Sequence, residues 1–296
     1  MKKLFSDRLM LILSMVLFGT LGPFVRNIGV SSGELALYRA ILAVILIGGF
    51  LLLTRQKIQF ASIKKELFLL LLSGMAMGFN WILLFEAYRY TTVSVATLSY
   101  YFAPVLVILL CPIIFKEKMG AKQWICFCFS TLGLVLITGI GNLSSGSNHL
   151  LGVGFGLGAA ALYATVILLN KAIKTVAGLH RTLLQFMAAI LVLLPYVCLT
   201  SGFTFGALDQ KGWICLLIVG LLHSGVAYCW YFSALKTLPG QKAAILSYID
   251  PLVAVLLSVT FLGEKMAPMQ WIGGILILGF TLWNEISHKK TQKTKK

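Results

Sequence analysis

Residues 243–273 read AAILSYIDPLVAVLLSVTFLGEKMAPMQWIG, and residues 96–126 read ATLSYYFAPVLVILLCPIIFKEKMGAKQWIC. The two stretches belong to a longer alignment without gaps, in which residues 78–125 match residues 225–272 at an offset of 147 residues. The matches include a proline, a Glu-Lys-Met triplet and a Gln-Trp-Ile triplet. Two unrelated apolar helices would rarely place such residues in register. The sequence therefore predicts that one unit occurs twice in the chain.

The chain is far more apolar than a soluble domain. Of its 296 residues, 59% are hydrophobic and 11% are charged, and the mean hydropathy is +0.92. Apolar runs of about 20 residues recur, which is the length that a helix needs to cross about 30 Å of hydrocarbon. We expect an all-α membrane protein with ten transmembrane helices, at residues 9–28, 33–53, 67–88, 93–115, 122–139, 151–170, 182–200, 213–232, 243–262 and 269–283.

These spans divide into two five-helix repeats, at residues 8–139 and 151–285, followed by a basic tail at 286–296. A unit with an odd number of spans must enter the bilayer from the opposite side in its second copy, so the predicted repeats are inverted. The charges agree, because Lys116 and Lys122 of the first copy correspond to Gly263 and Met269 in the second. Inverted repeats are a recurring architecture of secondary transporters, in which each half can close one face.

The basic residues predict the orientation of the chain. With a cytoplasmic N-terminus, 20 of the 25 Lys and Arg residues fall on the inner side, four fall on the outer side and Arg39 lies within a span. This asymmetry follows the positive-inside rule for short loops. We expect a multipass protein of the cell membrane with both termini in the cytoplasm and the tail close to anionic lipid headgroups. The net charge of +16 then indicates lipid contact, and we expect no nucleic-acid partner.

The repeated motif resembles the drug/metabolite transporter superfamily, and within it the EamA family, as two tandem domains. The resemblance is carried by Pro251, Gly263-Glu264-Lys265 and Gln270-Trp271-Ile272-Gly273, by a weaker copy around Pro104 and Glu117, and by Arg39. It implies ten helices, cytoplasmic termini and commonly the export of amino acids or other small metabolites.

We therefore expect a secondary active transporter that exports small polar metabolites by alternating access. The alternatives are an importer or a proton-coupled drug or amine exporter of the same fold. A multipass membrane enzyme is disfavoured, because the chain has no His-Glu-x-x-His, no Gly-x-Ser-x-Gly and no Gly-rich phosphate loop ahead of a Lys. The six cysteines fall in or at the ends of apolar spans, so we expect no metal and no cofactor. A monomer and a homodimer both stay open.

Two charged residues inside the spans are the first candidates for the transport site, because ionisable groups in hydrocarbon are costly. Arg39 either reaches the outer headgroups or pairs with Glu86, or it meets a substrate carboxylate. Asp250 either caps backbone groups freed by Pro251, or it binds a proton or a substrate amine. The first span contains no Glu, so Asp250 or Glu86 would have to carry any coupled proton.

The remaining candidates are polar or aromatic side chains that the spans place near the expected cavity. Pro104 and Pro251 are expected to kink the middle regions of their helices, although a kink that only improves packing is the alternative. His223 is either a packing residue or a proton relay. The central thirds of the last two spans hold no Lys or Arg, which disfavours phosphorylated substrates. The predicted substrate or proton pathway comprises Arg39, Asn80, Trp81, Glu86, Tyr100, Tyr101, His223, Tyr228, Tyr248 and Asp250.

Overall fold

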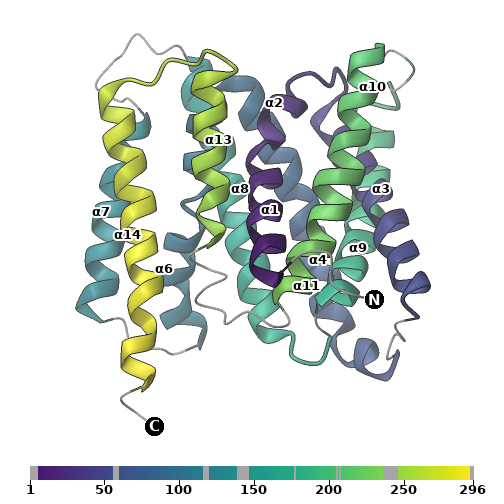
Figure 1. Ribbon diagram of the computed structural model, residues 1–296, viewed down its shortest axis with the longest axis horizontal. Coiled ribbons are helices and arrows are strands. Elements are labelled where there is room, and N and C mark those ends of the chain that lie inside the picture. The colour runs from purple at the N-terminus through teal and green to yellow at the C-terminus, as the bar shows by residue number, and fades with distance from the viewer. Residues whose placement is uncertain are drawn as a thin grey trace.

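The computed structural model is a bundle of helices (Figure 1). It describes residues 6–55, 60–115, 120–138, 147–176, 178–204, 206, 208–235 and 246–293. Within these residues the regular elements are all helices, which confirms the predicted all-α class. Glu117, which belongs to the weaker copy of the repeated motif, lies outside the described residues.

Each of the ten predicted spans overlaps at least one helix of the structure. The helices are α1 Asp7–Gly19, α2 Leu21–Val25, α3 Ser32–Leu53, α4 Phe60–Tyr90, α5 Val93–Tyr100, α6 Ala103–Phe115, α7 Ala121–Thr138, α8 Ser147–Ala172, α9 Gly178–Leu199, α10 Gln210–Leu217, the π-helix η2 Ile218–Val226, α11 Ala227–Leu235, α13 Ile249–Thr260 and α14 Pro268–Lys293.

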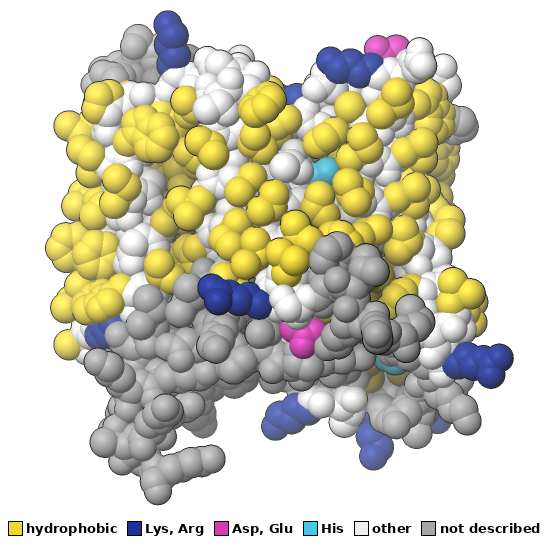
Figure 2. All heavy atoms as spheres, in the orientation of Figure 1, with side chains coloured by type: hydrophobic (Ala, Val, Ile, Leu, Met, Phe, Trp, Pro, Cys, Tyr) yellow, Lys and Arg dark blue, Asp and Glu magenta, His cyan; other side chains and the backbone are white. Residues whose placement is uncertain are grey.

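The surface and the helix lengths both fit a membrane environment. Within the described part of the chain, six helical segments are long and apolar enough to cross a bilayer, at Ser32–Leu53, Ile63–Tyr90, Val93–Leu110, Asn148–Asn170, Gly178–Leu199 and Gln210–Ala234. Three shorter apolar segments accompany them, at Ala121–Ile137, Ile249–Thr260 and Pro268–Trp283. Figure 2 shows hydrophobic side chains across the middle of the visible face, with most basic and acidic side chains toward its two ends.

The two prolines lie just after interruptions in their predicted spans. Pro104 is the second residue of α6 and Pro251 is the third residue of α13. A proline in the first turn has no helical hydrogen bond to lose, because the first N–H groups of a helix have no partner within it. The interruptions lie at Tyr101, which follows α5, and at Tyr248, which precedes α13. These two tyrosines are equivalent in the alignment of the repeats.

Two other predicted spans are also interrupted. The first breaks at Thr20, between α1 and α2. The span predicted at 213–232 widens into the π-helix η2 between α10 and α11. Interrupted helices leave backbone groups without helical partners, and membrane transporters place such breaks where the chain lines a binding site.

The two predicted repeats interlock. The most extensive helix contacts join α4 to α8 and α9, α7 to α14, and α3 to α9 and η2. Small residues allow the close approach: a Cβ atom at Gly152 of α8 would lie 2.7 Å from Thr91 Cβ, and one at Gly156 would lie 2.9 Å from Ser99 Cβ. These two glycines thus allow α8 to approach its neighbours closely.

Candidate functional site

Arg39 is a buried cation held at the interface of α3 and η2. Its residue is 3% exposed, and its Nε donates to Ser224 Oγ at 2.5 Å. Its Cζ lies 4.7 Å from the centre of the Trp81 ring and 5.7 Å from that of Phe85. The two terminal nitrogens have no hydrogen-bond partner among the described residues.

The expectation that Arg39 reaches the headgroups or pairs with Glu86 is therefore wrong. Glu86 instead pairs with Arg89 of its own helix at 3.3 Å, in a partly exposed contact. Glu86 and Arg89 lie one turn apart on α4, so this ion pair forms within one helix. The hydrogen bond and ion pair of Glu86 within the described residues join it to Arg89 and to none of the other predicted site residues.

Asp250 provides the opposite charge. Its Oδ2 accepts a hydrogen bond from the Tyr101 hydroxyl at 2.6 Å, which joins α13 to the break after α5. The described residues include no backbone N–H that donates to the Asp250 side chain, so capping of groups freed by Pro251 is not what holds it. Asp250 and Arg39 form no ion pair with each other, and both side chains lie beside aromatic side chains.

Three tyrosines lie near both charged groups. Tyr88, Tyr100 and Tyr228 each lie within electrostatic range of both Arg39 and Asp250. We call Arg39, Asp250 and the surrounding Trp81, Tyr88, Tyr100, Tyr101 and Tyr228 the central cluster. An aromatic wall with one cation and one carboxylate can receive a small molecule that carries both charges.

Further aromatic contacts fix the ring orientations of the central cluster. Tyr100 stacks on Tyr163 with ring centres 5.1 Å apart. Tyr228 meets Phe18 and Phe186 edge-on at 5.0 and 5.2 Å. Phe186 in turn packs edge-on against Trp81 at 5.0 Å. The contacts of Phe18, Tyr228, Phe186 and Trp81 thus form one continuous series that joins α1, α11, α9 and α4.

The π-helix η2 positions two consecutive side chains of this site. His223 is buried, with Nε2 at 2.7 Å from Thr20 Oγ1 at the break after α1 and Nδ1 at 3.2 Å from the Ile218 carbonyl. Ser224, the next residue, accepts the bond from Arg39 and donates to the Val219 carbonyl at 2.9 Å. Both ring nitrogens of His223 are therefore engaged, as its packing interpretation requires. Single turns of π-helix are frequent at functional sites.

Two predicted site residues have other surroundings. Asn80 is buried and donates from Nδ2 to the Ala159 carbonyl at 2.6 Å, which ties α4 to α8. Tyr248 stands at the start of α13, two residues before Asp250. Asn80 therefore joins two helices, and Tyr248 lies at the start of a helix.

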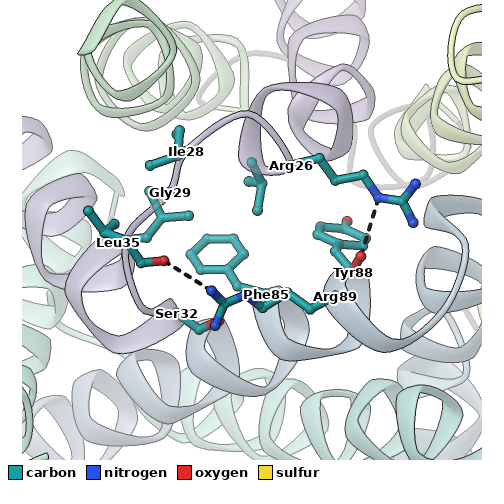
Figure 3. A pocket seen from close by; sticks show the side chains of 10 residues that line it. Arg26, Ile28, Gly29, Ser32, Leu35, Phe85, Tyr88 and Arg89 are labelled. Carbon is teal, nitrogen blue, oxygen red and sulfur yellow. Dashed lines mark hydrogen bonds between the residues drawn. The ribbon is translucent and has the colours of Figure 1, made fainter. Parts of the chain in front are cut away.

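A cavity of about 520 Å³ opens at the end of the bundle that carries α2 (Figure 3). We call it the vestibule; it is lined by Val25, Arg26, Ile28, Gly29, Val30, Ser32, Leu35, Phe85, Tyr88 and Arg89. Phe85 and Tyr88 belong to its wall and also lie close to Arg39. The vestibule therefore reaches the side chains that border the central cluster.

Sequence reasoning missed several residues that the fold brings to these sites. Ser224 and Thr20 carried no signal, because hydroxyl side chains are common in apolar helices. Tyr163 lies in a span from which no site residue was chosen. Arg26 and Glu264 lie beside the vestibule. In the sequence, Arg26 is only one of the basic residues on the predicted outer side, and Glu264 is only part of the repeated motif. Across the described residues, no three His, Cys, Asp or Glu side chains gather to hold a metal ion.

Comparisons with known proteins agree with the fold and the repeat. The model of the EamA-like transporter family matches residues 8–139 and 150–284. The uncharacterized transporter YxxF of Bacillus subtilis is 32% identical over 271 residues, covering 90% of this chain and 85% of that protein. Protein RarD of Salmonella typhi is 29% identical, covering 71% of this chain and 69% of that protein.

Two more distant proteins extend the likeness. Solute carrier family 35 member G1 of Mus musculus is 26% identical, covering 90% of this chain and 74% of that protein. One crystal structure superposes with a TM-score of 0.63 at 17% identity, covering 93% of this chain and 96% of that one. At that identity the superposition supports the fold alone.

Proposed function

We propose that this chain, which belongs to the EamA-like transporter family, is a secondary active transporter that exports small polar metabolites such as amino acids by alternating access. The observation that carries the proposal is the buried guanidinium of Arg39, whose terminal nitrogens have no hydrogen-bond partner among the described residues. A charge is retained inside a membrane bundle chiefly where it acts on a substrate or an ion.

The substrate class follows from the two charges of the central cluster. The planar fork of an arginine matches a carboxylate, and a carboxylate such as Asp250 receives an ammonium group or a proton. The tyrosines near both groups offer apolar area and hydroxyls to the rest of the substrate. A small zwitterion uses both ends of this site, whereas a phosphorylated sugar finds a single arginine and an opposing carboxylate.

The proposed cycle uses the duplicated architecture. Ten transmembrane helices form two inverted five-helix repeats. The protein lies in the cell membrane, with both termini in the cytoplasm. The central cluster stays between the repeats while one end of the bundle and then the other opens. The protein requires lipid around it and a small-molecule substrate, and no nucleic acid.

Transport in proteoliposomes tests the proposal. The purified full-length chain is reconstituted, the liposomes are loaded with a panel of amino acids, amines and organic acids, and efflux is followed by mass spectrometry. We expect saturable efflux of at least one zwitterionic compound, which the Arg39→Gln variant loses. If folded wild-type protein moves no compound of the panel faster than protein-free liposomes, the proposed function is wrong.

A further inference from the structure

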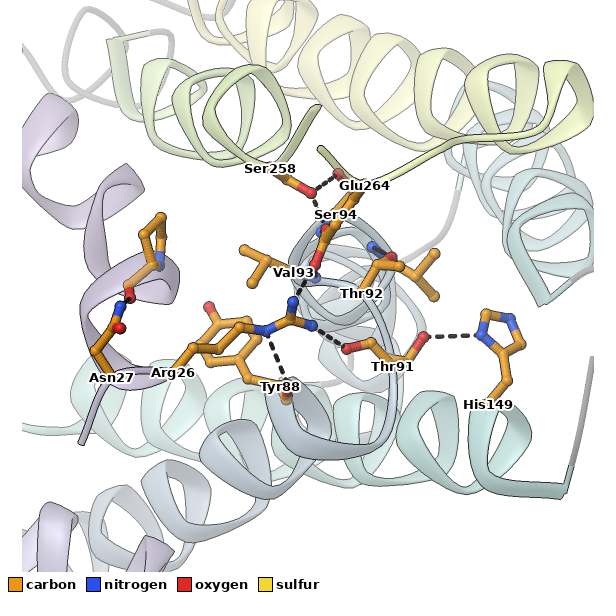
Figure 4. Close-up of polar contacts among 12 residues, drawn as sticks. Arg26, Asn27, Tyr88, Thr91, Thr92, Val93, Ser94, His149, Ser258 and Glu264 are labelled. Carbon is orange, nitrogen blue, oxygen red and sulfur yellow. Dashed lines mark hydrogen bonds and ion pairs between the residues drawn. The ribbon is translucent and has the colours of Figure 1, made fainter. Parts of the chain in front are cut away.

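An ion pair joins the two halves of the chain beside the vestibule. Arg26 Nη1 lies 2.5 Å from Glu264 Oε1 (Figure 4). Arg26 also donates from Nε to the Tyr88 carbonyl at 3.2 Å and from Nη2 to the Thr91 carbonyl at 2.7 Å. All three directions of the guanidinium are thus occupied, and its side chain still keeps 33% exposure at the vestibule wall.

Glu264 is held by donors from several segments. Its Oε1 accepts from the Val93 N–H at 3.0 Å, and its Oε2 accepts from the Ser94 N–H at 3.4 Å and from the Ser258 hydroxyl. The carboxylate therefore caps the N-terminus of α5, where unpaired N–H groups and the helix dipole favour a negative charge. Its side chain is only 6% exposed.

This cluster closes one end of an antiparallel seam between α5 and α13. Beside it, the Ser94 hydroxyl donates to Ser258 Oγ at 2.7 Å. At the other end of the same seam, Tyr101 donates to Asp250. From Ser94 to Tyr101 the chain rises about 10 Å at 1.5 Å per residue. Separation of α5 from α13 would therefore expose the Asp250 side of the central cluster to the vestibule end.

We propose that Arg26 and Glu264 form a latch that holds the vestibule end closed, and that the latch must break for substrate to pass between α5 and α13. Arg26 and α5 belong to the first half of the chain, and Glu264 and Ser258 to the second. The other ion pair among the described residues, Glu86 with Arg89, lies within α4 and links no two elements.

The cluster is suited to reversible opening. The Arg26 side chain keeps 33% exposure at the vestibule, so the guanidinium can be rehydrated when it separates from the buried Glu264 carboxylate. The repeated motif thereby acquires a function in its second copy, because Glu264 is the glutamate of the Glu264-Lys265-Met266 triplet. Loss of one charge-assisted hydrogen bond changes an equilibrium constant by about tenfold, so a single substitution here should shift the balance between closed and open.

The test measures access to a cysteine placed behind the latch. Thr97 lies on α5 one turn beyond Val93 and is 3% exposed, so Thr97→Cys places a thiol behind the latch. In a full-length chain whose native cysteines are replaced, labelling by a membrane-impermeant maleimide is timed from each side of the membrane. We expect Glu264→Gln and Arg26→Gln to speed labelling from the vestibule side about tenfold.

A neighbouring variant supplies the control. Lys265 is exposed and adjacent in the chain, so Lys265→Gln should leave the labelling rate unchanged. If Glu264→Gln lowers the yield of folded protein, Ser258→Ala removes one donor while keeping the carboxylate, and a smaller rise is expected. Equal labelling of the folded variants and the parent chain would overturn the proposal.

The labelling is measured without substrate, so its outcome tests the latch separately from transport. The latch rests on the proposed function only in that the vestibule end must open and close. Faster labelling in a protein that transports nothing would reject the proposed function and leave the latch in place. Normal transport with unchanged labelling would reject the latch and leave the proposed function in place.

Discussion

At the scale of single residues, Arg39 is the side chain whose presence the fold explains least. A buried ion loses several kcal/mol of hydration. One charged hydrogen bond returns about 1.5 to 3 kcal/mol, and the contact with Trp81 about 0.5 to 2 kcal/mol. With its terminal nitrogens unbonded among the described residues, Arg39 contributes little to stability. Its place in the bundle is better explained by a ligand.

Arg39→Gln should therefore separate function from stability. We expect the rate of substrate efflux to fall about tenfold or more, because a charge-assisted contact to the substrate is lost. The melting temperature in detergent should stay the same or rise, since a buried charge is removed. A variant that melts well below the parent chain while its remaining folded fraction transports normally would contradict this assignment.

Asp250→Asn tests the second charge, with Tyr101→Phe as its matched partner. Asparagine can still accept the Tyr101 hydrogen bond but cannot bind a proton or pair with an amine. If Asp250 binds a proton, we expect Asp250→Asn to abolish the dependence of the efflux rate on pH. If Asp250 pairs with the substrate, we expect the variant to lose its preference for substrates that carry an amine. Tyr101→Phe keeps the carboxylate and should preserve that dependence. An unchanged rate and pH profile in Asp250→Asn would remove this residue from coupling.

At the scale of elements, the sequence predicted where helices lie far better than where they break. Apolar runs of membrane length depend on composition, so every predicted span overlaps a helix of the structure. A proline in such a run has two outcomes, a kinked helix or a helix that ends and restarts. The choice at Tyr101 depends on partners far away in the chain, since Tyr101 meets Asp250 there. The π-helix at Ile218–Val226 likewise carried no sequence signal.

Helix packing can be tested on two glycines of α8. A methyl group at Gly152 would lie 2.7 Å from Thr91 Cβ, whereas one at Gly154 would meet no atom within 4 Å. Gly152→Ala should lower the melting temperature, because overpacking costs about 1 to 3 kcal/mol. Gly154→Ala should leave it unchanged or raise it, because alanine favours the helix by about 1 kcal/mol. Equal melting temperatures would show that α8 does not approach the connection between α4 and α5 this closely.

At the scale of the whole molecule, the sequence predicted the duplication but not how the halves meet. The motif around Pro251 and Glu264 indicated an ancestral unit and a family. Its contact with Arg26 and with the start of α5 is a tertiary feature, formed by residues more than 170 positions apart. The same holds for Arg39 with Ser224, which are 185 positions apart. Candidate residues could thus be found in the sequence by their charge and by their depth in a predicted span. The residues that they contact could not be found in this way.

The central claim is that the two halves expose one site alternately, and counterflow tests it most directly. Proteoliposomes are loaded with an excess of unlabelled substrate and diluted into a trace of the labelled compound. A carrier that exchanges one molecule at a time should accumulate label transiently above its equilibrium level, and Arg39→Gln should abolish the overshoot. A monotonic approach to equilibrium by folded wild-type protein would indicate a channel and contradict alternating access.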